Sequence, residues 1–253
     1  MIHHGHSWFK LSTSDVDHSR IHANGLTSTK PIDLARLSMR VCAVLFFTSS
    51  PLENDILNFK NQGFVVIDDF LTNPILNSLQ EIYETQNNWQ LIEQQRDHYY
   101  EHVFKTSSSF LPNEDESYYA KFSRSTDIES HIEIHNVYIK YFKPSMEILI
   151  GKKLNTVENR CYKLGPGDFY RTHIDDYAGE IASTYYINNR WIWDWGGILN
   201  IVYDNEGENV FSIFPKCNRV VFLDNKKFRF PHFITRVEDF SQQSRYTYVT
   251  FNK

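Results

Sequence analysis

The C-terminal part of the chain, from Leu154 onward, is a series of short segments with the composition of β-strands. They are rich in aromatic and β-branched residues, and polar turn signals such as Gly165-Pro-Gly-Asp168 and Asp204-Asn-Glu-Gly207 separate them. The candidate strands are Thr156–Leu164, Phe169–Ile174, Ser183–Ile187, Gly197–Tyr203, Val210–Phe214, Arg219–Leu223, His232–Val237 and Tyr246–Asn252. Many short strands with polar turns predict a mainly β fold with a double-sheet jelly roll as its core.

Composition agrees with one sizeable β-rich domain. The chain has 253 residues, and 15% of them are aromatic. The formal net charge is −5 and no block of lysine or arginine stands out, so nucleic acid is a poor candidate partner. The three cysteines form no CxxC pair, which favours a reducing compartment. No apolar run is long enough to cross a membrane, and we expect a cytoplasmic protein without a membrane partner.

The first part of the chain differs from the rest. Residues 1–50 are rich in His, Ser and Thr and show no sustained apolar period, so we expect a flexible leader followed by a single domain over residues 51–253. That domain opens with a strand within Asn61–Phe70, entered through Gly63, and with a helix capped at Thr72 or Asn73. Residues 90–125 are less regular.

A second helix is expected over roughly Thr126–Phe142, ended or restarted by Pro144. Its periodic positions are Ile128, Ile132, His135, Ile139 and Phe142. The two helices would support the β core.

Two residues at the end of the second candidate strand carry the strongest chemical signal. His173 and Asp175 are two residues apart, so alternation along a strand places both side chains on one face. An imidazole and a carboxylate on one face are two thirds of the facial triad that suits non-haem Fe(II). The third ligand is predicted to be His232, which opens the seventh strand, because the second and seventh strands of an eight-stranded jelly roll are neighbours.

Two other histidine pairs need weighing. The pairs His98/His102 and His131/His135 are each spaced i, i+4, a spacing that binds zinc in some enzymes. Neither has the HExxH pattern or an obvious third ligand, so surface or core packing is the favoured interpretation for both.

Arg245 stands at the start of the last strand, and its position predicts a buried charge. Thr247, Val249 and Phe251 share its face, so the arginine would point into an otherwise apolar barrel. A surface guanidinium at a strand end is the plain alternative. A bidentate clamp for a carboxylate is the functional interpretation, because an unpaired buried charge would be costly. Arg236 is the rival for this role.

The ordered set of these residues resembles the double-stranded β-helix core of the Fe(II)/2-oxoglutarate oxygenases, and within them the prolyl-hydroxylase-like branch. The resemblance covers about residues 155–252. The matching residues are Cys161-Tyr162, Gly167-Asp-Phe-Tyr170, His173-Ile-Asp175, Thr184-Tyr-Tyr-Ile-Asn188, Trp191, Gly196-Gly-Ile-Leu199, Phe214-Pro215, Arg219-Val-Val-Phe222, Pro231-His232 and Arg245.

The resemblance implies a role for individual residues. His173, Asp175 and His232 would hold Fe(II). Arg245 would bind the far carboxylate of the co-substrate 2-oxoglutarate, with the Tyr186 hydroxyl as its helper. Tyr162 would line the co-substrate pocket near the metal, and Thr247 matches a serine that touches the same carboxylate in some relatives. Tyr162 and Tyr186 have an equal alternative as ordinary core tyrosines. O2 is the second co-substrate implied, with ascorbate as a candidate reductant.

The activity implied is hydroxylation of an aliphatic C–H bond of a prolyl or other amino-acid residue. Asp175 fills the carboxylate position of the triad, which favours hydroxylation over halogenation. The substrate, small-molecule or peptidyl, is expected near the tryptophan-rich loop, at Arg190, Trp191 and Trp193, and under residues 90–125.

Three alternatives stay open. The first is a small-molecule hydroxylase of the same superfamily. The second is a nucleic-acid demethylase, although such enzymes carry a second arginine where this chain has apolar residues such as Phe251. The third is a non-catalytic, cupin-like binding protein, against which Arg245 argues.

Overall fold

The computed structural model describes residues 51–95, 118–175, 179–202 and 209–253, all within one compact unit, Val44–Lys253. The leader 1–50 and the pair His98/His102 lie outside the described residues. The strands are β1 (Phe64–Ile67), β2 (Gln90–Gln95), β3 (Tyr118–Arg124), β4 (Thr156–Leu164), β5 (Phe169–His173), β6 (Ile181–Tyr186), β7 (Leu199–Val202), β8 (Val210–Ile213), β9 (Arg219–Asp224), β10 (His232–Ile234) and β11 (Arg245–Asn252). The helices are α2 (Glu53–Gln62), α3 (Asn73–Thr85), α5 (Thr126–Glu129), α6 (Ile132–Val137), a π-helical turn (Tyr138–Phe142), α7 (Lys143–Ile150) and a 3-10 turn (Trp193–Trp195).

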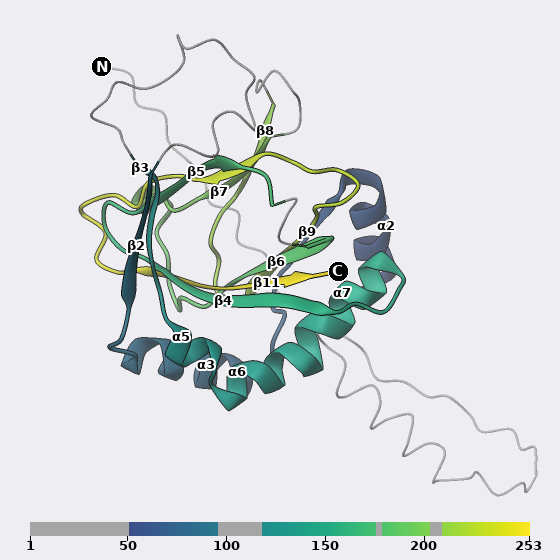
Figure 1. Cartoon of the computed structure of the whole chain (residues 1–253), viewed down its shortest axis with the longest axis horizontal. Helices are drawn as coiled ribbons and strands as arrows, with labels where there is room; N and C mark the ends of the chain where they lie inside the picture. Colours follow the sequence, from purple (N-terminus) through teal and green to yellow (C-terminus); the bar gives the residue numbers. More distant parts are fainter. Residues whose placement is uncertain (1–50, 96–117, 176–178, 203–208) are drawn as a thin grey trace, which may run out of the picture. The chain divides into compact units, whose positions relative to one another are not determined.

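The eight strands from β4 onward form the predicted jelly roll (Figure 1). The hydrogen-bonded order is continuous, β1-β9-β6-β11-β4-β3-β5-β10-β7-β8. We call the part β1-β9-β6-β11-β4 the larger sheet and the part β5-β10-β7-β8 the smaller sheet, and β3 joins them. All of these neighbours are antiparallel. The second and seventh strands of the core, β5 and β10, are neighbours as the sequence predicted. The mainly β fold class is therefore confirmed.

One side of the barrel is closed by a hairpin that the sequence pattern did not indicate. Strand β3 pairs with β4 through Ser123 and Arg124, and with β5 through Ala120 and Lys121. It thus passes from the larger sheet to the smaller one, and β2 pairs along the whole length of its other edge, from Arg124 to Tyr118. The described parts of residues 90–125 therefore belong to the barrel wall.

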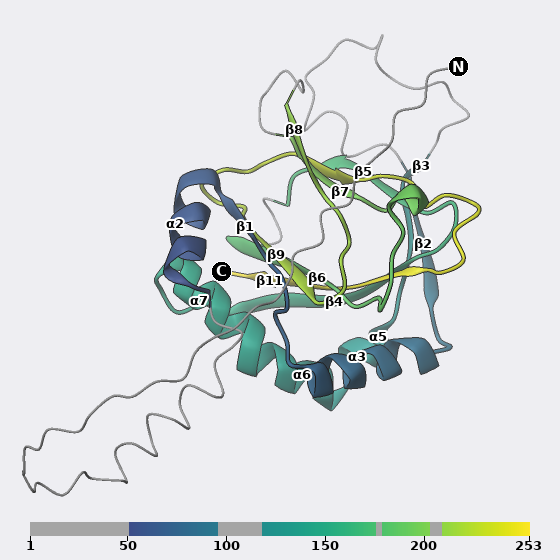
Figure 2. The same ribbon diagram turned by 180° about the vertical axis from the view of Figure 1, so that it is seen from behind.

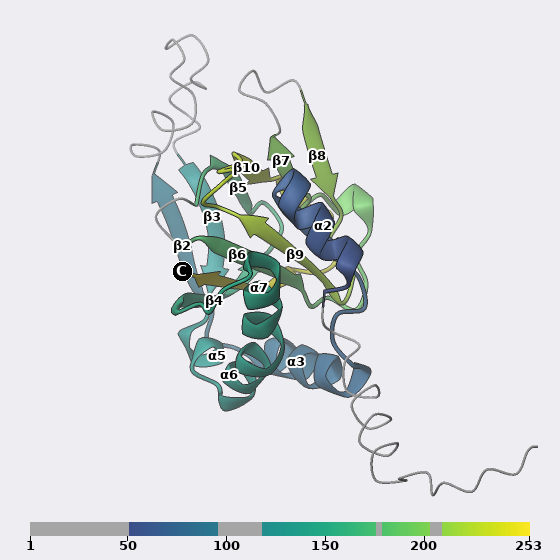
Figure 3. The ribbon, with the colours of Figure 1, turned by 90° about the vertical axis from the view of Figure 1, so that its right-hand side faces the viewer.

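The helices cover the outer face of the larger sheet (Figures 2 and 3). The main apolar core lies between them, and joins helix residues such as Leu79 and Phe142 to sheet residues such as Cys161, Tyr185 and Phe222. Aromatic side chains dominate this layer, with Phe142 edge-on to both Tyr185 and Tyr248. No helix among the described residues combines the length and the apolar character needed to span a membrane.

The apolar stripe predicted for residues 126–142 is wrong at its three middle positions. Ile128 and Phe142 are buried, but Ile132 is 65% exposed, Ile139 is 46% exposed and His135 is also exposed. The helix breaks after Glu129, and a new one begins with the His131 ring accepting a hydrogen bond from the Glu133 amide. This break shifts the phase, so that the buried side chains are Ile134, Val137 and Tyr138.

Pro144 does not end the helical run. The amide of Lys143 bonds five residues back, to the Tyr138 carbonyl, and α7 then starts with Pro144 in its first turn. Proline is tolerated there because a first-turn amide has no partner within its own helix.

Gly63 and Asn218 hold the segments on either side of β1 against the barrel. Gly63 ends α2 with φ +79°, and a Cβ atom there would lie 2.3 Å from the Phe228 ring. Asn218, also left-handed with φ 59°, is buried and bonds both the amide and the carbonyl of Leu71 at 2.8 Å. The Asn218 side chain also accepts from the Tyr185 hydroxyl at 2.8 Å. The segment before α3 is thereby fixed to the larger sheet.

Candidate active site

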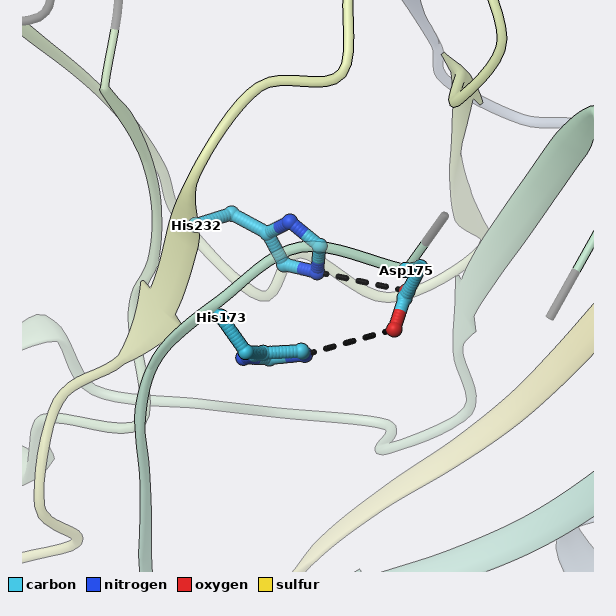
Figure 4. A group of neighbouring side chains, drawn as sticks. All are labelled: His173, Asp175 and His232. Atoms are coloured by element: carbon cyan, nitrogen blue, oxygen red, sulfur yellow. Dashed lines mark ion pairs between the residues drawn. The ribbon is translucent and has the colours of Figure 1, made fainter. Parts of the chain in front are cut away.

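The three predicted metal ligands lie together inside the barrel (Figure 4). His173 and His232 are directly opposite each other in the β5–β10 pair, and their ring centroids are 4.2 Å apart. Asp175 lies two residues beyond the end of β5, with Oδ1 3.6 Å from His173 Nε2 and Oδ2 3.4 Å from His232 Nε2. One ligand atom from each residue falls within 4.8 Å of the others. The geometry is that of a facial triad.

Backbone carbonyls orient both imidazole rings. The Nδ1 atom of His173 lies 2.8 Å from the Arg171 carbonyl, and Nδ1 of His232 lies 3.1 Å from the Phe230 carbonyl. A carbonyl can only accept, so each Nδ1 carries a proton. When a ring is neutral, its Nε2 therefore carries the lone pair, on the side where Asp175 lies. This arrangement fixes the tautomer that a metal-binding histidine needs.

The titration of the three groups reflects their burial and their mutual contacts. Burial lowers the pKa of His173 to about 4, helped by the neighbouring His232. Burial alone would raise the pKa of Asp175, but the hydrogen bond from His232 and the charges of both rings outweigh it and lower the pKa to about 2. Burial would lower the pKa of His232, yet the Asp175 carboxylate raises it above its usual value. The ligand set is therefore one ionised carboxylate with two imidazoles. His173 is readily neutral, whereas the Asp175 charge favours the protonated form of His232.

Among the described residues, this is the one group of three or more His, Cys, Asp or Glu side chains close enough to hold a metal ion. His131 caps α6, and His135 is exposed on the same helix, in agreement with the non-metal interpretation of that pair.

The triad lines a cavity of about 50 Å³. Apolar side chains from both sheets make most of the wall, among them Phe122, Leu199, Val249 and Phe251. A mostly apolar wall with a few convergent polar groups is the usual character of a small-molecule site.

Arg245 lies in the wall of the same cavity and is completely buried. None of its three guanidinium nitrogens has a hydrogen-bond partner among the described residues. The guanidinium carbon lies 4.9 Å from the centre of the Tyr186 ring, and the buried Tyr186 hydroxyl also lacks a partner. Burial lowers the pKa of Arg245, so its charged form is unfavourable without an anion. The buried guanidinium of Arg245 is therefore suited to bind a negatively charged ligand.

The path of Arg245 depends on Gly197. A Cβ atom at position 197 would lie 2.9 Å from Cδ of Arg245, and Gly197 has φ +65°. Trp191 supports this turn, because its Nε1 donates to the Gly196 carbonyl at 2.9 Å.

Thr247 and Tyr162 also line the cavity, facing each other across the β11–β4 ladder. Thr247 is buried and lies opposite Tyr186 on its other side. Burial raises the pKa of Tyr162 to about 12, so its hydroxyl stays protonated. Its oxygen accepts from Arg160 at 3.0 Å. Three of the four residues predicted for the co-substrate, Arg245, Thr247 and Tyr162, therefore line the cavity, and Tyr186 lies against Arg245. Their roles stay predictions.

Arg236 does not enter the cavity. It lies after β10, its side chain is 54% exposed, and its Nη2 pairs with Asp239 at 3.0 Å. The register in which β11 begins at Arg245 is the one the sequence predicted.

The residues predicted for the substrate are not in the cavity wall. Arg190 is exposed, Trp193 is 73% exposed, and Trp191 is buried edge-on against Trp195. Their substrate role stays a prediction without support from the geometry.

The sequence reasoning missed Arg160, Phe122 and Tyr170, all of which line the cavity. A signal for Arg160 was present, because it is two residues before Tyr162 on one strand and so shares its face. No comparable pattern marked Phe122, whose strand was not predicted.

The described residues fit Fe(II) and 2-oxoglutarate. Two imidazole nitrogens and one carboxylate oxygen form the donor set of a non-haem iron centre. The partnerless nitrogens of Arg245 in the same cavity fit a dicarboxylate that reaches the metal with its other end. Fe(II) and 2-oxoglutarate are thus implied together.

Comparison with solved structures supports the same fold. A prolyl hydroxylase from Trichoplax adhaerens, in complex with a hypoxia inducible factor peptide fragment, has a TM-score of 0.52 and 18% identity, and the match covers 88% of this chain and 94% of that one. A Pseudomonas putida prolyl-4-hydroxylase has a TM-score of 0.52 and 14% identity, with 79% and 97% covered. A non-heme alpha ketoglutarate dependent epimerase from nogalamycin biosynthesis has a TM-score of 0.56 and 8% identity, with 79% and 81% covered.

Sequence comparison finds one matching family model, over the C-terminal part of the chain. No curated protein matches the chain significantly. The family model described as the 2OG-Fe(II) oxygenase superfamily matches residues 158–252, the stretch that holds the triad and Arg245. With an intact His-Asp-His triad in that stretch, residues 158–252 are a match to the 2OG-Fe(II) oxygenase superfamily.

Proposed function

We propose that this chain is an Fe(II)- and 2-oxoglutarate-dependent dioxygenase that hydroxylates an aliphatic C–H bond. The observation that carries the proposal is a facial triad in one cavity with a fully buried arginine that has no hydrogen-bond partner among the described residues. A binding protein without catalysis would need neither the oriented Nε2 atoms nor the buried guanidinium.

In this proposal, each residue has a task. His173, Asp175 and His232 hold the metal, and the carbonyls behind the two rings keep their lone pairs aimed. Arg245 binds the far carboxylate of 2-oxoglutarate, with the hydroxyls of Tyr186 and Thr247 beside it. Asp175 fills the third ligand position, which leaves no place for a halide and supports hydroxylation.

The bound iron, with 2-oxoglutarate and O2, supplies the oxidising chemistry that places one oxygen atom in the substrate and releases succinate and CO2. The apolar walls keep bulk water from the reacting C–H bond, which limits side reactions. Ascorbate is proposed as the reductant that keeps the iron ferrous.

A prolyl or other amino-acid residue is the first substrate class to test, because two of the structural neighbours are prolyl hydroxylases. A small metabolite is the second candidate, because a third neighbour is an epimerase from nogalamycin biosynthesis. Nucleic acid is not proposed, since the chain carries a formal charge of −5.

The test begins with co-substrate turnover. Wild-type protein with Fe(II) and O2 should convert 2-oxoglutarate to succinate, slowly without substrate and faster with one. His232→Ala should abolish this conversion, whereas Arg236→Ala, a matched exposed arginine, should leave it unchanged. A wild-type protein that binds Fe(II) but never forms succinate, whatever peptide or metabolite is added, would favour the cupin-like alternative.

A further inference from the structure

The active-site cavity contains a second arginine, Arg160, which the co-substrate does not require. Arg160 lies on β4, opposite Val249, and its side chain is 19% exposed. Arg245 pairs with Leu164 in the same ladder, so the two arginines leave the sheet about 13 Å apart along the strand. Both line the cavity that holds the triad. One cavity therefore offers two separate guanidinium groups.

The two arginines differ in depth. Arg245 is fully buried, whereas part of Arg160 reaches solvent. A co-substrate that must be in place before the substrate fits the deeper arginine. The outer arginine is then left for the molecule that enters afterwards.

Arg160 is held firmly in place from one side. Its Nη2 donates to Glu158 Oε2 at 2.6 Å, and its guanidinium lies 5.0 Å from the centre of the Phe251 ring. Glu158 is held in turn by Arg124, at 2.9 Å, and Arg124 is paired with Glu129 at 2.7 and 2.8 Å. This charge network fixes the orientation of Arg160 before any ligand arrives, which lowers the entropic cost of binding.

The same contacts leave hydrogen-bond donors without acceptors. The Nε atom of Arg160 is buried and has no partner among the described residues. Its Nη1 donates to the Tyr162 hydroxyl at 3.0 Å, so the Tyr162 oxygen already accepts and its own proton is free to be donated. Both oxygens of Glu158 are already engaged by arginines. This part of the cavity therefore offers donors, and a ligand must supply acceptors.

We propose, on the basis of the function proposed above, that Arg160 binds a carboxylate group of the primary substrate, with the Tyr162 hydroxyl as a second donor. The Arg160 Nε–H and the Tyr162 hydroxyl are two donors that the oxygens of a carboxylate can accept from. The neighbouring wall, made by Phe122, Thr184, Val249 and Phe251, suits an aliphatic body. The substrate class is thus an aliphatic carboxylic acid, such as an amino-acid derivative with a free carboxyl group, whose C–H bond lies over the metal while its carboxylate rests on Arg160.

The test compares acids with their amides in protein loaded anaerobically with Fe(II) and 2-oxoglutarate. N-acetyl-L-proline, N-acetyl-L-leucine and N-acetyl-L-valine are each titrated beside the corresponding carboxamide, and binding is followed through the metal-to-co-substrate absorption band. The free acid should bind roughly tenfold to a hundredfold more tightly than its amide. Arg160→Gln should remove that preference, Arg160→Lys should restore part of it, and Lys163→Gln, on the opposite face of β4, should leave it intact.

The affinity for 2-oxoglutarate separates this role from a structural one. It should change less than threefold in Arg160→Gln, since Arg245 binds the co-substrate. If Arg160→Gln does not fold because Glu158 loses its partner, the double variant Glu158→Gln/Arg160→Gln removes both charges and is measured instead.

Two results would overturn the inference: a wild-type protein that binds no acid of the panel better than its amide, or a preference that survives in the glutamine variant. Absence of succinate formation from 2-oxoglutarate with O2 would instead refute the proposed function. The anaerobic binding comparison would still report on Arg160 in that case.

Discussion

Replacing Arg245 with methionine should stabilise the ligand-free protein and weaken its response to 2-oxoglutarate. The side chain is fully buried without a hydrogen-bond partner among the described residues, and burial lowers its pKa. Exchanging buried ionic groups for apolar side chains of similar volume is worth about 1–4 kcal/mol, from which the loss of the contact with the Tyr186 ring subtracts about 1 kcal/mol. For a domain of about 200 residues, the resulting net gain of about 0–3 kcal/mol raises the melting temperature by up to roughly 12 °C.

The response to 2-oxoglutarate should move in the opposite direction. At a concentration one hundred times the dissociation constant, the ligand stabilises the wild-type protein by about 2.7 kcal/mol. Losing a charge-assisted contact of about 1.5–3 kcal/mol raises the dissociation constant roughly tenfold to a hundredfold. The same concentration then stabilises Arg245→Met by only about 0.4–1.4 kcal/mol.

Thermal unfolding with and without 2-oxoglutarate measures both effects, with Mn(II) in place of iron to prevent turnover. Arg245→Lys should show neither the full gain in stability nor the full loss of affinity, because an ammonium keeps the charge but not the planar fork. Arg236→Met, an exposed residue, should change the melting temperature little. If Arg245→Met melts below the wild type and still responds fully to 2-oxoglutarate, the arginine is a structural residue and the co-substrate assignment is wrong.

Three further predictions concern the metal site and the scaffold. The double variant His131→Ala/His135→Ala should keep the metal stoichiometry of the wild type, whereas His232→Ala should lose the metal, as measured by elemental analysis after gel filtration. A metal binds only neutral imidazoles, and the neighbouring carboxylate raises the pKa of His232 above 6.5, whereas the pKa of His173 is about 4. Co(II) affinity should therefore fall about tenfold per pH unit below the pKa of His232. An affinity that stays constant between pH 8 and pH 5 would contradict this assignment. Asn218→Ala removes three buried hydrogen bonds and places alanine at φ 59°, so the free energy of unfolding in urea should fall by about 3–4 kcal/mol. A fall below about 1 kcal/mol would mean that this side chain does not hold the segment before α3 in place.

The sequence predicted the jelly roll and the triad because both depend on short-range regularities. Strand period and polar turns located the eight core strands within a few residues, and the ordinal positions of two of them brought His173 and His232 opposite each other. Asp175 was predicted on a strand face, and it lies just past the strand end, still close to both rings.

The misses have local physical causes. The side chains predicted to face the core after Ile128 were wrong because the helix is interrupted at Ser130 and begins again in a different orientation. The positions of apolar residues do not reveal an interruption that contains neither glycine nor proline. Strand β3 was missed because its local composition does not mark it as a strand. Its place in the barrel depends on pairing with β4 and β5, which the residues of β3 alone do not reveal. Trp191 was read as a substrate residue, but it supports the glycine turn behind Arg245.

The two histidine ligands and the residues proposed to recognise the substrate come from different sheets. Both histidine ligands are on the smaller sheet, and each ring is oriented by the carbonyl two residues before it, Arg171 on β5 and Phe230 just ahead of β10. Arg160, Val249 and Phe251 project from the larger sheet, across the cavity. Substitutions on the larger sheet can therefore reshape the substrate pocket without disturbing the imidazole ligands. A barrel divided in this way can acquire new substrates through single side-chain exchanges while keeping one oxidative reaction, which makes its specificity far more evolvable than its chemistry.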